Sequence, residues 1–273
     1  MAKVRFERST TWAAATRVVF LGSNGHCTER LNLARSALAR MVGAGKCAPL
    51  EIREVEYPGF EGRAPAANLE EFLAEAARQT AQLSTPSTVH YATGAGGLIL
   101  LALRARDGAP GRIILQAPVL WGLEARRFPL WMRVPAAGWM VRAAMRLPPV
   151  RWWFSRKYFT GKVPGDVKRA FFRGYARCRG FARLFSWLEP SFLRDLEARF
   201  REKPSRLEGV EVWWGGRDRV LTTAELVPTE AALGVRWPLR EFPEWGHYPM
   251  IEQPEEWIAK VGQAAGGAGF GLY

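Results

Sequence analysis

The chain has 273 residues, of which 48% are hydrophobic, and its formal net charge is +13. This length and apolar content suit one large α/β domain with room for an insertion. No apolar run reaches the roughly 18 residues of a membrane-spanning helix, and the early charged residues are not typical of a cleaved signal peptide. Three cysteines, Cys27, Cys47 and Cys178, show neither metal-ligand spacing nor a disulfide framework. These features predict a cytoplasmic protein without a structural metal.

Strand and helix patterns alternate along the first 120 residues. A weak strand is expected at 3–9. Further strands are predicted at Thr16–Gly22, Leu50–Tyr57, Thr88–Thr93 and Gly111–Pro118. The helices predicted between them are Glu29–Val42, Asn68–Leu83 and Gly96–Arg106. Asn68 is the expected N-cap of its helix. Such alternation predicts a mostly parallel sheet covered by helices on both faces.

The excess positive charge lies in one segment. Residues 121–205 contain 19 basic and 6 acidic residues, a difference of 13 that equals the net charge of the whole chain. The same segment holds 17 of the 33 aromatic residues. Its repeated prolines predict several separate helices, because proline fits only the first turn of a helix. A change in composition this sharp indicates a separate structural unit.

The alternating pattern returns after residue 205. A strand is predicted at Gly209–Gly215, a helix at Thr222–Leu233 and a last strand at Val235–Phe242. The Gly- and Ala-rich tail that starts at Ala264 is expected to be a frayed terminus.

One turn carries the clearest motif. Small residues from Ala92 to Gly97 join the strand at Thr88 to the helix that ends at Arg106. The turn resembles the nucleophile elbow of the α/β-hydrolase family, whose pattern is small-x-nucleophile-x-small. Ala92 and Gly96 take the two small positions, and the nucleophile position falls on Gly94. The elbow is therefore predicted without its nucleophile.

Three further segments resemble that family. The run from Gly215 to Val220 is similar to the "G-x-x-D-x-[VI]" turn that bears the triad acid, here Asp218. The run from Gly246 to Trp257 is similar to "G-H-x-P-x-x-E-x-P-E-x-[FW]", with His247 in the place of the triad base. Leu21-Gly22-Ser23 takes the place of the oxyanion strand end, although the usual His before the Gly is missing.

This resemblance implies an architecture. It implies an α/β-hydrolase fold, with a mostly parallel central sheet and helices on both faces. Residues 1–120 and 206–273 are expected to form the core. Residues 121–205 are expected to form a helical, basic and aromatic cap that overhangs the mouth of the active site.

The resemblance also implies the residues of a site. Catalytic positions are His247, Asp218 and the degenerate nucleophile position Gly94, and the oxyanion hole falls on the backbone N–H groups of Ser23 and Ala95. The residues expected to bind substrate are Trp121, Asn24 and Tyr248. No cofactor and no metal ion are expected.

Function is left open between two classes. The His247–Asp218 dyad would serve general-base chemistry, which needs no covalent nucleophile, on a small or lipid-like carbonyl compound. The alternative is a catalytically inactive pseudoenzyme that binds a ligand or associates with a membrane. Serine-type hydrolysis is not expected, because glycine has no atom with which to attack a carbonyl. A change of Gly94 from serine by engineering is a third interpretation.

The charge of the 121–205 segment allows three interpretations. Arginine-rich helices are often simply solvated. Arginine mixed with tryptophan and phenylalanine also suits an anionic membrane surface or an anionic amphiphile. Nucleic acid fits the charge alone, but no nucleic-acid motif is present and none is expected to bind. Peripheral membrane association of a cytoplasmic protein is the sharper of these hypotheses.

Overall fold

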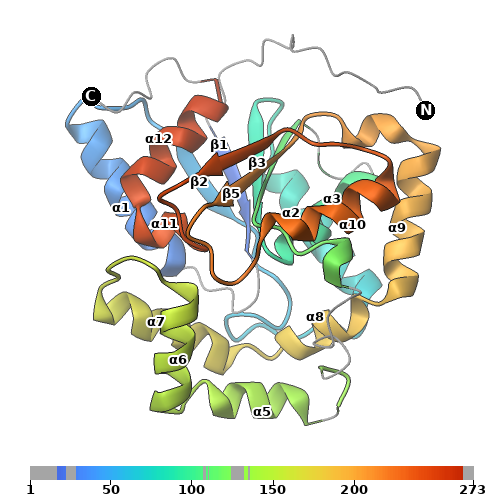
Figure 1. Cartoon of the computed structure of the whole chain (residues 1–273), viewed down its shortest axis with the longest axis horizontal. Coiled ribbons are helices and arrows are strands. Elements are labelled where there is room, and N and C mark those ends of the chain that lie inside the picture. The colour runs from blue at the N-terminus through green and yellow to red at the C-terminus, as the bar shows by residue number, and fades with distance from the viewer. Residues whose placement is uncertain are drawn as a thin grey trace.

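A six-stranded sheet forms the centre of the molecule (Figure 1). The computed structural model describes residues 17–22, 29–106, 109, 111–123, 132–134 and 136–266. The strand order is β2-β1-β3-β4-β5-β6, and every neighbouring pair is parallel. The strands are β1 Arg17–Leu21, β2 Glu51–Glu54, β3 Thr88–Thr93, β4 Arg112–Gln116, β5 Val210–Gly215 and β6 Leu239–Phe242. The predicted α/β-hydrolase fold with a mostly parallel sheet is confirmed.

Helices cover both faces of this sheet, as parallel strands require. On one face lie α1 Glu29–Gly43, α11 Pro249–Glu252 and α12 Pro254–Ala264 (Figure 1). On the other lie α2 Leu69–Leu83, α3 Gly96–Ala105, α9 Pro190–Glu202 and α10 Leu226–Leu233. Short 3-10 turns occur at Trp121–Leu123 (η1), Pro204–Leu207 (η2) and Thr223–Glu225 (η3).

Four further helices gather on one side of the sheet, and we call them the cap helices. They are α5 Ala137–Ala144, α6 Pro148–Tyr158, α7 Gly165–Arg177 and α8 Phe181–Trp187 (Figure 1). Prolines mark the starts of two of them, since Pro148 is the first residue of α6 and Pro164 directly precedes α7. The longest described helices, α1 and α2, have 15 residues each. No described helix combines the length and apolar character of a membrane span.

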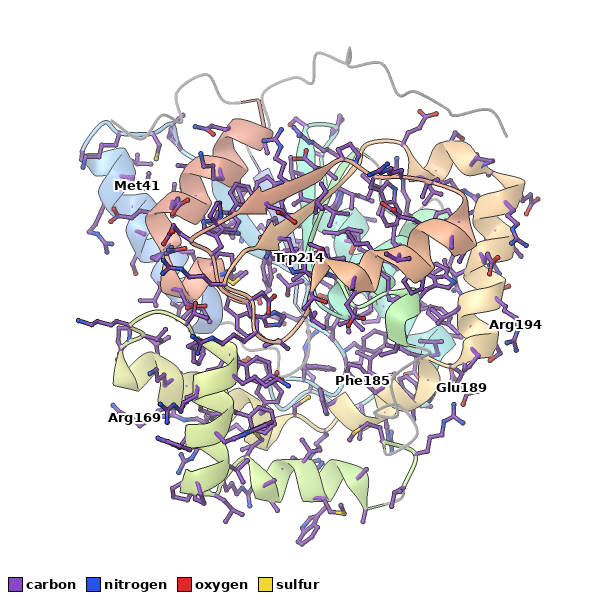
Figure 2. The ribbon with its side chains drawn as sticks, in the orientation of Figure 1. Met41, Arg169, Phe185, Glu189, Arg194 and Trp214 are labelled. Carbon is purple, nitrogen blue, oxygen red and sulfur yellow. The ribbon has the colours of Figure 1, made fainter. Side chains whose placement is uncertain are left out.

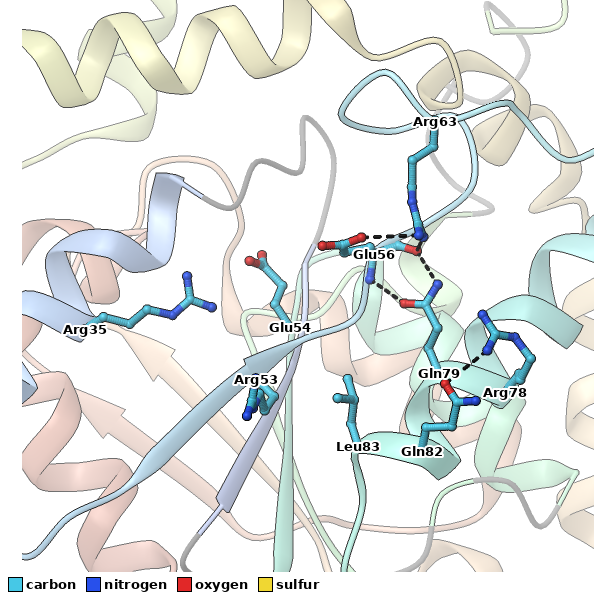
Figure 3. Close-up of a pocket in the computed structure, with 9 residues that line it drawn as sticks. All are labelled: Arg35, Arg53, Glu54, Glu56, Arg63, Arg78, Gln79, Gln82 and Leu83. Carbon is cyan, nitrogen blue, oxygen red and sulfur yellow. Dashed lines mark hydrogen bonds and ion pairs between the residues drawn. The ribbon is translucent and has the colours of Figure 1, made fainter.

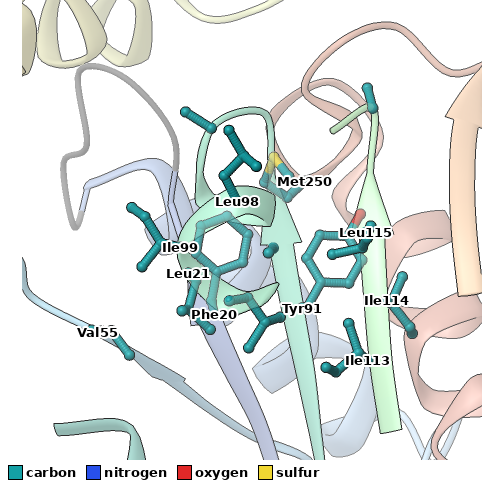
Figure 4. Packing of buried hydrophobic residues seen from close by; sticks show 14 of the residues in the cluster. Phe20, Leu21, Val55, Tyr91, Leu98, Ile99, Ile113, Ile114, Leu115 and Met250 are labelled. Atoms are coloured by element: carbon teal, nitrogen blue, oxygen red, sulfur yellow. The ribbon is translucent and has the colours of Figure 1, made fainter. Parts of the chain in front are cut away.

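The core sits between the central strands and α3. All six residues of β3 are buried, and Figure 4 shows Phe20, Tyr91 and Ile114 with Leu98 of α3 in one cluster. The Tyr91 hydroxyl donates to Gln116 Oε1 at 3.0 Å, which satisfies it away from water. Burial raises the pKa of this phenol. The rigid core therefore fixes β3, and with it the turn that follows.

Several predicted elements match the structure closely. β3 and α1 begin where the pattern placed them. The Asn68 side chain accepts a hydrogen bond from the Glu71 amide at 2.9 Å, so it is the N-cap of α2 as predicted. The Glu71 carboxylate accepts in return from the Ala67 amide at 2.8 Å. Reciprocal bonds of this kind fix the start of a helix.

Three predicted boundaries are wrong. β2 stops at Glu54 rather than Tyr57, because Tyr57 turns inward and packs on the rings of Phe60 and Phe72. β6 begins at Leu239 rather than Val235, since pairing with β5 starts only where the Val212 amide donates to the Pro238 carbonyl. The helix expected at 222–233 starts as the 3-10 turn η3 and becomes α10 at Leu226. The weak strand expected at 3–9 lies outside the described residues.

His90 of β3 predicts an acid-sensitive core. Its ring is fully buried and lies 2.8 Å from Ser84 Oγ through Nε2. Burial, and then the positive charge of Arg104, lower the pKa of His90 to about 4. The unfolded chain binds this proton near pH 6.5. The contribution of the neutral His90 ring to the free energy of unfolding is therefore fully present above pH 6.5. It is lost progressively as the pH drops toward about 4.

We expect the free energy of unfolding to fall by about 2 to 3 kcal/mol between pH 7.5 and pH 4.5 because of this one group. Urea unfolding of the wild type and of His90→Gln at both pH values measures it. The loss on acidification is expected to be smaller in the variant by that amount. Equal losses in the two proteins would show that His90 is not the group responsible.

Candidate active site

The turn after β3 has the geometry of an elbow. Gly94 has a φ of 52°, in the left-handed region that favours glycine. Its amide donates to the Gln116 carbonyl at 3.2 Å, and its carbonyl accepts from the amides of Gly97 and Val119 at 3.1 and 3.0 Å. These bonds fix a reversal between β3 and α3. The nucleophile position is thus held at the carboxyl end of the sheet.

The two glycines that follow are required by close packing. A Cβ atom on Gly96 would lie 2.4 Å from the Gly22 carbonyl oxygen and 2.5 Å from that of Leu21. A Cβ atom on Gly97 would lie 3.0 Å from Pro118 Cβ. Since the first two contacts are with backbone, only glycine fits at Gly96 without moving β1. This is the small position that the sequence pattern assigned to it.

His247 and Asp218 meet as a hydrogen-bonded pair. The distance from His247 Nδ1 to Asp218 Oδ2 is 2.7 Å. The other carboxylate oxygen of Asp218 accepts from the amides of Val220 and Leu221 at 2.7 and 3.0 Å. The Asp218 side chain is fully buried and that of His247 is 6% exposed. The carboxylate is therefore fixed in orientation and in turn orients the imidazole.

The fold brings the pair to the same edge of the sheet as the elbow. Gly94 follows β3, Asp218 follows β5 and His247 follows β6, and these strands are parallel. The chain before His247 then folds back over the end of β5. The Arg217 amide donates to the Trp245 carbonyl at 2.9 Å, and a Cβ on Gly215 would lie 2.4 Å from that same oxygen. This return carries His247 from the edge strand toward the middle of the sheet.

Two tyrosines enclose the imidazole. The ring of Tyr248 meets that of His247 edge to face, with centroids 4.6 Å apart. The ring of Tyr158, from the end of α6, lies with its centroid 5.7 Å from that of His247. Tyr248 also packs on Phe171 of α7 at 5.2 Å. The cap helices thus contribute directly to the surroundings of His247, and Tyr158 is a site residue that the sequence reasoning missed.

Glu252 joins the His247 segment to the cap. Its Oε2 accepts three hydrogen bonds, from the Thr160 amide at 2.7 Å, the Thr160 hydroxyl at 2.9 Å and the Gly161 amide at 2.6 Å. Gly246 lies against this cluster, since a Cβ there would come 2.4 Å from Glu252 Oε1. The glutamate of the "G-H-x-P-x-x-E" motif therefore acts as a clamp between α11 and the loop after α6. The sequence motif includes this glutamate but does not predict its hydrogen bonds to Thr160 and Gly161.

The other predicted site residues fall into two groups. Ala95 is fully buried at the start of α3, and its amide donates no hydrogen bond within the described residues. Trp121 is 4% exposed in η1, after β4. Both therefore follow the carboxyl ends of central strands. Ser23 and Asn24 lie outside the described residues.

Two hollows occur elsewhere in the described part of the chain. One, of about 380 Å³, lies between α1, β2 and α2, where Arg63 pairs with Glu56 and the Gln79 amide bonds the Glu56 backbone (Figure 3). The other, of about 330 Å³, lies in the cap. Neither is lined by Gly94, Asp218 or His247. No group of three His, Cys, Asp or Glu side chains among the described residues is arranged to hold a metal ion.

Comparison with known proteins agrees with this fold. The chain is similar to the enol-lactonase of Burkholderia xenovorans LB400, with a TM-score of 0.62, 15% identity and 92% of each chain covered. It is similar to a haloalkane dehalogenase loop variant from Bradyrhizobium elkanii, with a TM-score of 0.64, 14% identity and 94% and 90% covered. It is similar to a bacterial membrane phospholipase A, with a TM-score of 0.59, 16% identity and 92% and 78% covered.

At these identities the solved structures establish the fold alone. A comparison with curated protein sequences gave no significant match. The model of the alpha/beta hydrolase family, in contrast, matches residues 18–261, which include both stretches of the sheet and everything between them. The chain therefore belongs to the alpha/beta hydrolase family.

Proposed function

We propose that the protein is a general-base enzyme that acts without a covalent intermediate. The observation that carries this proposal is the pair formed by His247 Nδ1 and Asp218 Oδ2 at 2.7 Å, at the same edge of the sheet as an elbow whose tip is Gly94. The bond to Asp218 leaves Nε2 as the nitrogen available to a substrate, and the hydrogen bond given for the His247 side chain within the described residues is the one through Nδ1. A base positioned by a buried carboxylate is suited to proton abstraction.

The chemistry follows from these atoms. His247 Nε2 takes a proton from a bound water molecule or from the carbon next to a carbonyl group. In the first case the hydroxide adds to the carbonyl carbon, and the proton on the imidazole later goes to the leaving oxygen. In the second case the electron pair of the C–H bond forms an enolate. Asp218 stabilises the imidazolium in both cases.

The start of α3 supports stabilisation of the negative oxygen. The Ala95 amide has no acceptor among the described residues and lies at the N-terminus of a ten-residue helix. Helix N-termini carry partial positive charge and stabilise anions. Ser23, which the family pattern places in the second oxyanion position, is the proposed second donor. The aromatic surroundings of His247, with Tyr158 and Tyr248, favour a small or lipid-like carbonyl substrate.

A second candidate is a pseudoenzyme that binds its ligand without converting it. Two observations favour it. Gly94 provides no nucleophile, and the His247 side chain is only 6% exposed beneath the ring of Tyr158. In this case the His247–Asp218 bond is retained as a structural link between the loops that follow β5 and β6. The two candidates differ in whether turnover depends on Nε2.

Turnover by the wild type and by His247→Ala separates these candidates. The substrates are a panel of activated esters, lactones and acyl thioesters. On at least one of them we expect the variant to react 100- to 10,000-fold more slowly than the wild type, as general-base catalysis predicts. Arg219→Ala is the matched control, because Arg219 is exposed in the same loop as Asp218. Circular dichroism verifies that both variants are folded. Equal rates in His247→Ala and the wild type would favour the pseudoenzyme.

A further inference from the structure

The outer surface of α5 and α6 has an unusual share of exposed apolar side chains. Six of the eight exposed large hydrophobic residues found in the described chain fall within 134–153, and they are Val134, Trp139, Met140, Leu147, Trp152 and Trp153. Trp139 is 66% exposed and Trp152 is 60% exposed. Large apolar side chains exposed together on one stretch of a chain are typical of a site of interaction. We call these six residues the apolar face.

Positive charge surrounds the apolar face. Residues 136–187 include twelve lysines and arginines and a single acidic residue, Asp166. Arg169, Arg173 and Arg177 are spaced four residues apart on α7, so they lie on one side of that helix. With Arg146 and Arg151 they line the cap hollow of about 330 Å³. Figure 2 shows Arg169 at the outer edge of the molecule.

The five arginines of this hollow lack counter-charges. None forms an ion pair with a carboxylate among the described residues. Outside the cap helices, in contrast, Arg17 pairs with Glu51 and Arg106 pairs with Glu70. Guanidinium groups bind phosphate oxygens with two parallel hydrogen bonds. A hollow lined by five of them, with Phe172 and Met145 as its apolar wall, is suited to a phosphate on an apolar stem.

We propose that the cap helices bind the surface of an anionic lipid bilayer. The apolar face enters the interface, and the arginine hollow takes a lipid phosphate. A bilayer is the occupant because the two features meet at the turn between α5 and α6, where apolar Leu147 follows Arg146. Nucleic acid would satisfy the arginines and leave Val134, Met140 and Leu147 in water. Tryptophan with arginine is the composition of interfacial helices.

The cation–π contacts of α6 support the same occupant. Arg156 lies 4.7 Å from the ring centroid of Trp152, and Lys157 lies 5.5 Å from that of Trp153. These cations cover ring faces on which a nucleic-acid base would stack. In a bilayer, Arg156 and Lys157 can keep their charges at the headgroups while the rings of Trp152 and Trp153 enter the acyl boundary.

Flotation of the full chain with vesicles tests the proposal. The two vesicle types are phosphatidylcholine alone and phosphatidylcholine with 30% phosphatidylglycerol. We expect binding to the anionic vesicles at low salt, at least tenfold weaker binding at 0.5 M salt, and at least tenfold weaker binding to the neutral vesicles. Each basic group near an anionic surface contributes about fivefold to the partition coefficient. Arg146→Gln with Arg169→Gln and Arg173→Gln is therefore expected to lower binding by about 100-fold.

Variants of the apolar face test insertion separately. Trp139→Ala with Trp152→Ala is expected to lower binding to anionic vesicles at least tenfold and to reduce quenching of tryptophan fluorescence by brominated lipid. The matched controls are Val227→Ala, an apolar residue 65% exposed on α10, and Arg236→Gln, an exposed arginine of the core. Both controls are expected to bind as the wild type does.

Three results would overturn the proposal. They are equal binding to both vesicle types, no binding at low salt, and binding that needs the arginines but not the tryptophans. The last result, together with competition by a short RNA, would indicate a soluble polyanion as the partner. The proposal does not rest on catalysis, so His247→Ala is expected to bind vesicles as the wild type does, and failure of either proposal is recognised separately.

Discussion

The wild-type chain is expected to remain unlabelled by a serine-directed fluorophosphonate probe, and Gly94→Ser is expected to be labelled. The tip of the elbow is Gly94, with its φ of 52°, and the described turn from Ala92 to Gly97 contains no Ser, Cys or Asp. Removal of the nucleophile from a complete triad costs about a million-fold in kcat. A serine placed at the tip regains part of that factor, and we expect at least a 1,000-fold faster reaction with the probe.

Two controls show that the new serine works through the proposed dyad. Gly94→Ser with His247→Ala is expected to lose most of the gain, because the hydroxyl then has no base. Gly94→Ala tests the cost of a side chain at positive φ, which is about 1 to 2 kcal/mol in the left-handed region. Thermal unfolding measures this cost. Labelling of the wild type that disappears in Ser23→Ala would instead locate the reactive centre at Ser23.

The second large effect concerns the packing of the elbow. Gly96→Ala is expected to lower the free energy of unfolding by about 3 kcal/mol, the upper end of the usual cost of overpacking, because the new contacts are with backbone. The added Cβ would lie 2.4 Å from the Gly22 oxygen and 2.5 Å from the Leu21 oxygen, and neither oxygen belongs to a flexible side chain. Leu21 is the last residue of β1, which is paired to β3, and Gly22 follows it directly. Urea unfolding measures the change.

Gly43→Ala is the matched control. Gly43 is the last residue of α1, and a Cβ there would meet nothing within 4 Å. Because alanine favours a helix over glycine by about 1 kcal/mol in helix interiors, this control is expected to be neutral or slightly stabilising. If Gly96→Ala unfolded at the same urea concentration as Gly43→Ala, the close approach of α3 and β1 would not be the reason for glycine at this position.

The sequence allowed much of the fold to be predicted, because the central strands are short apolar runs bounded by turns. β3, buried along its whole length, is an example. Predictions failed where an apolar residue is buried without being in a strand. Tyr57 lies in a turn and Trp237 precedes β6, yet both are buried as deeply as strand residues. Hydrophobic pattern reports burial, and only the hydrogen-bond ladder decides where a strand ends.

The candidate site was predictable only where a family motif marks it. His247 and Asp218 come from motifs, and their hydrogen bond follows from the parallel order of β5 and β6. Tyr158 is 89 residues from His247 along the chain, and no spacing or motif relates the two. The arginine hollow gave a partial signal, since the four-residue spacing of Arg169, Arg173 and Arg177 predicts one helical face. That Arg146 and Arg151 face the same hollow depends on how the cap helices pack.

The clamp made by Glu252 gives the cap a pivot. Its carboxylate fixes the loop between α6 and α7 at Thr160 and Gly161, only a few residues from Tyr158. A tilt of α6 about this anchored end would move its far end at Pro148 most, Trp152 and Trp153 near its middle less, and Tyr158 beside the ring of His247 least. The displacement of each residue of α6 would grow with its distance from Thr160 and Gly161. A movement of the apolar face would therefore reach the imidazole only as a small shift of the Tyr158 ring.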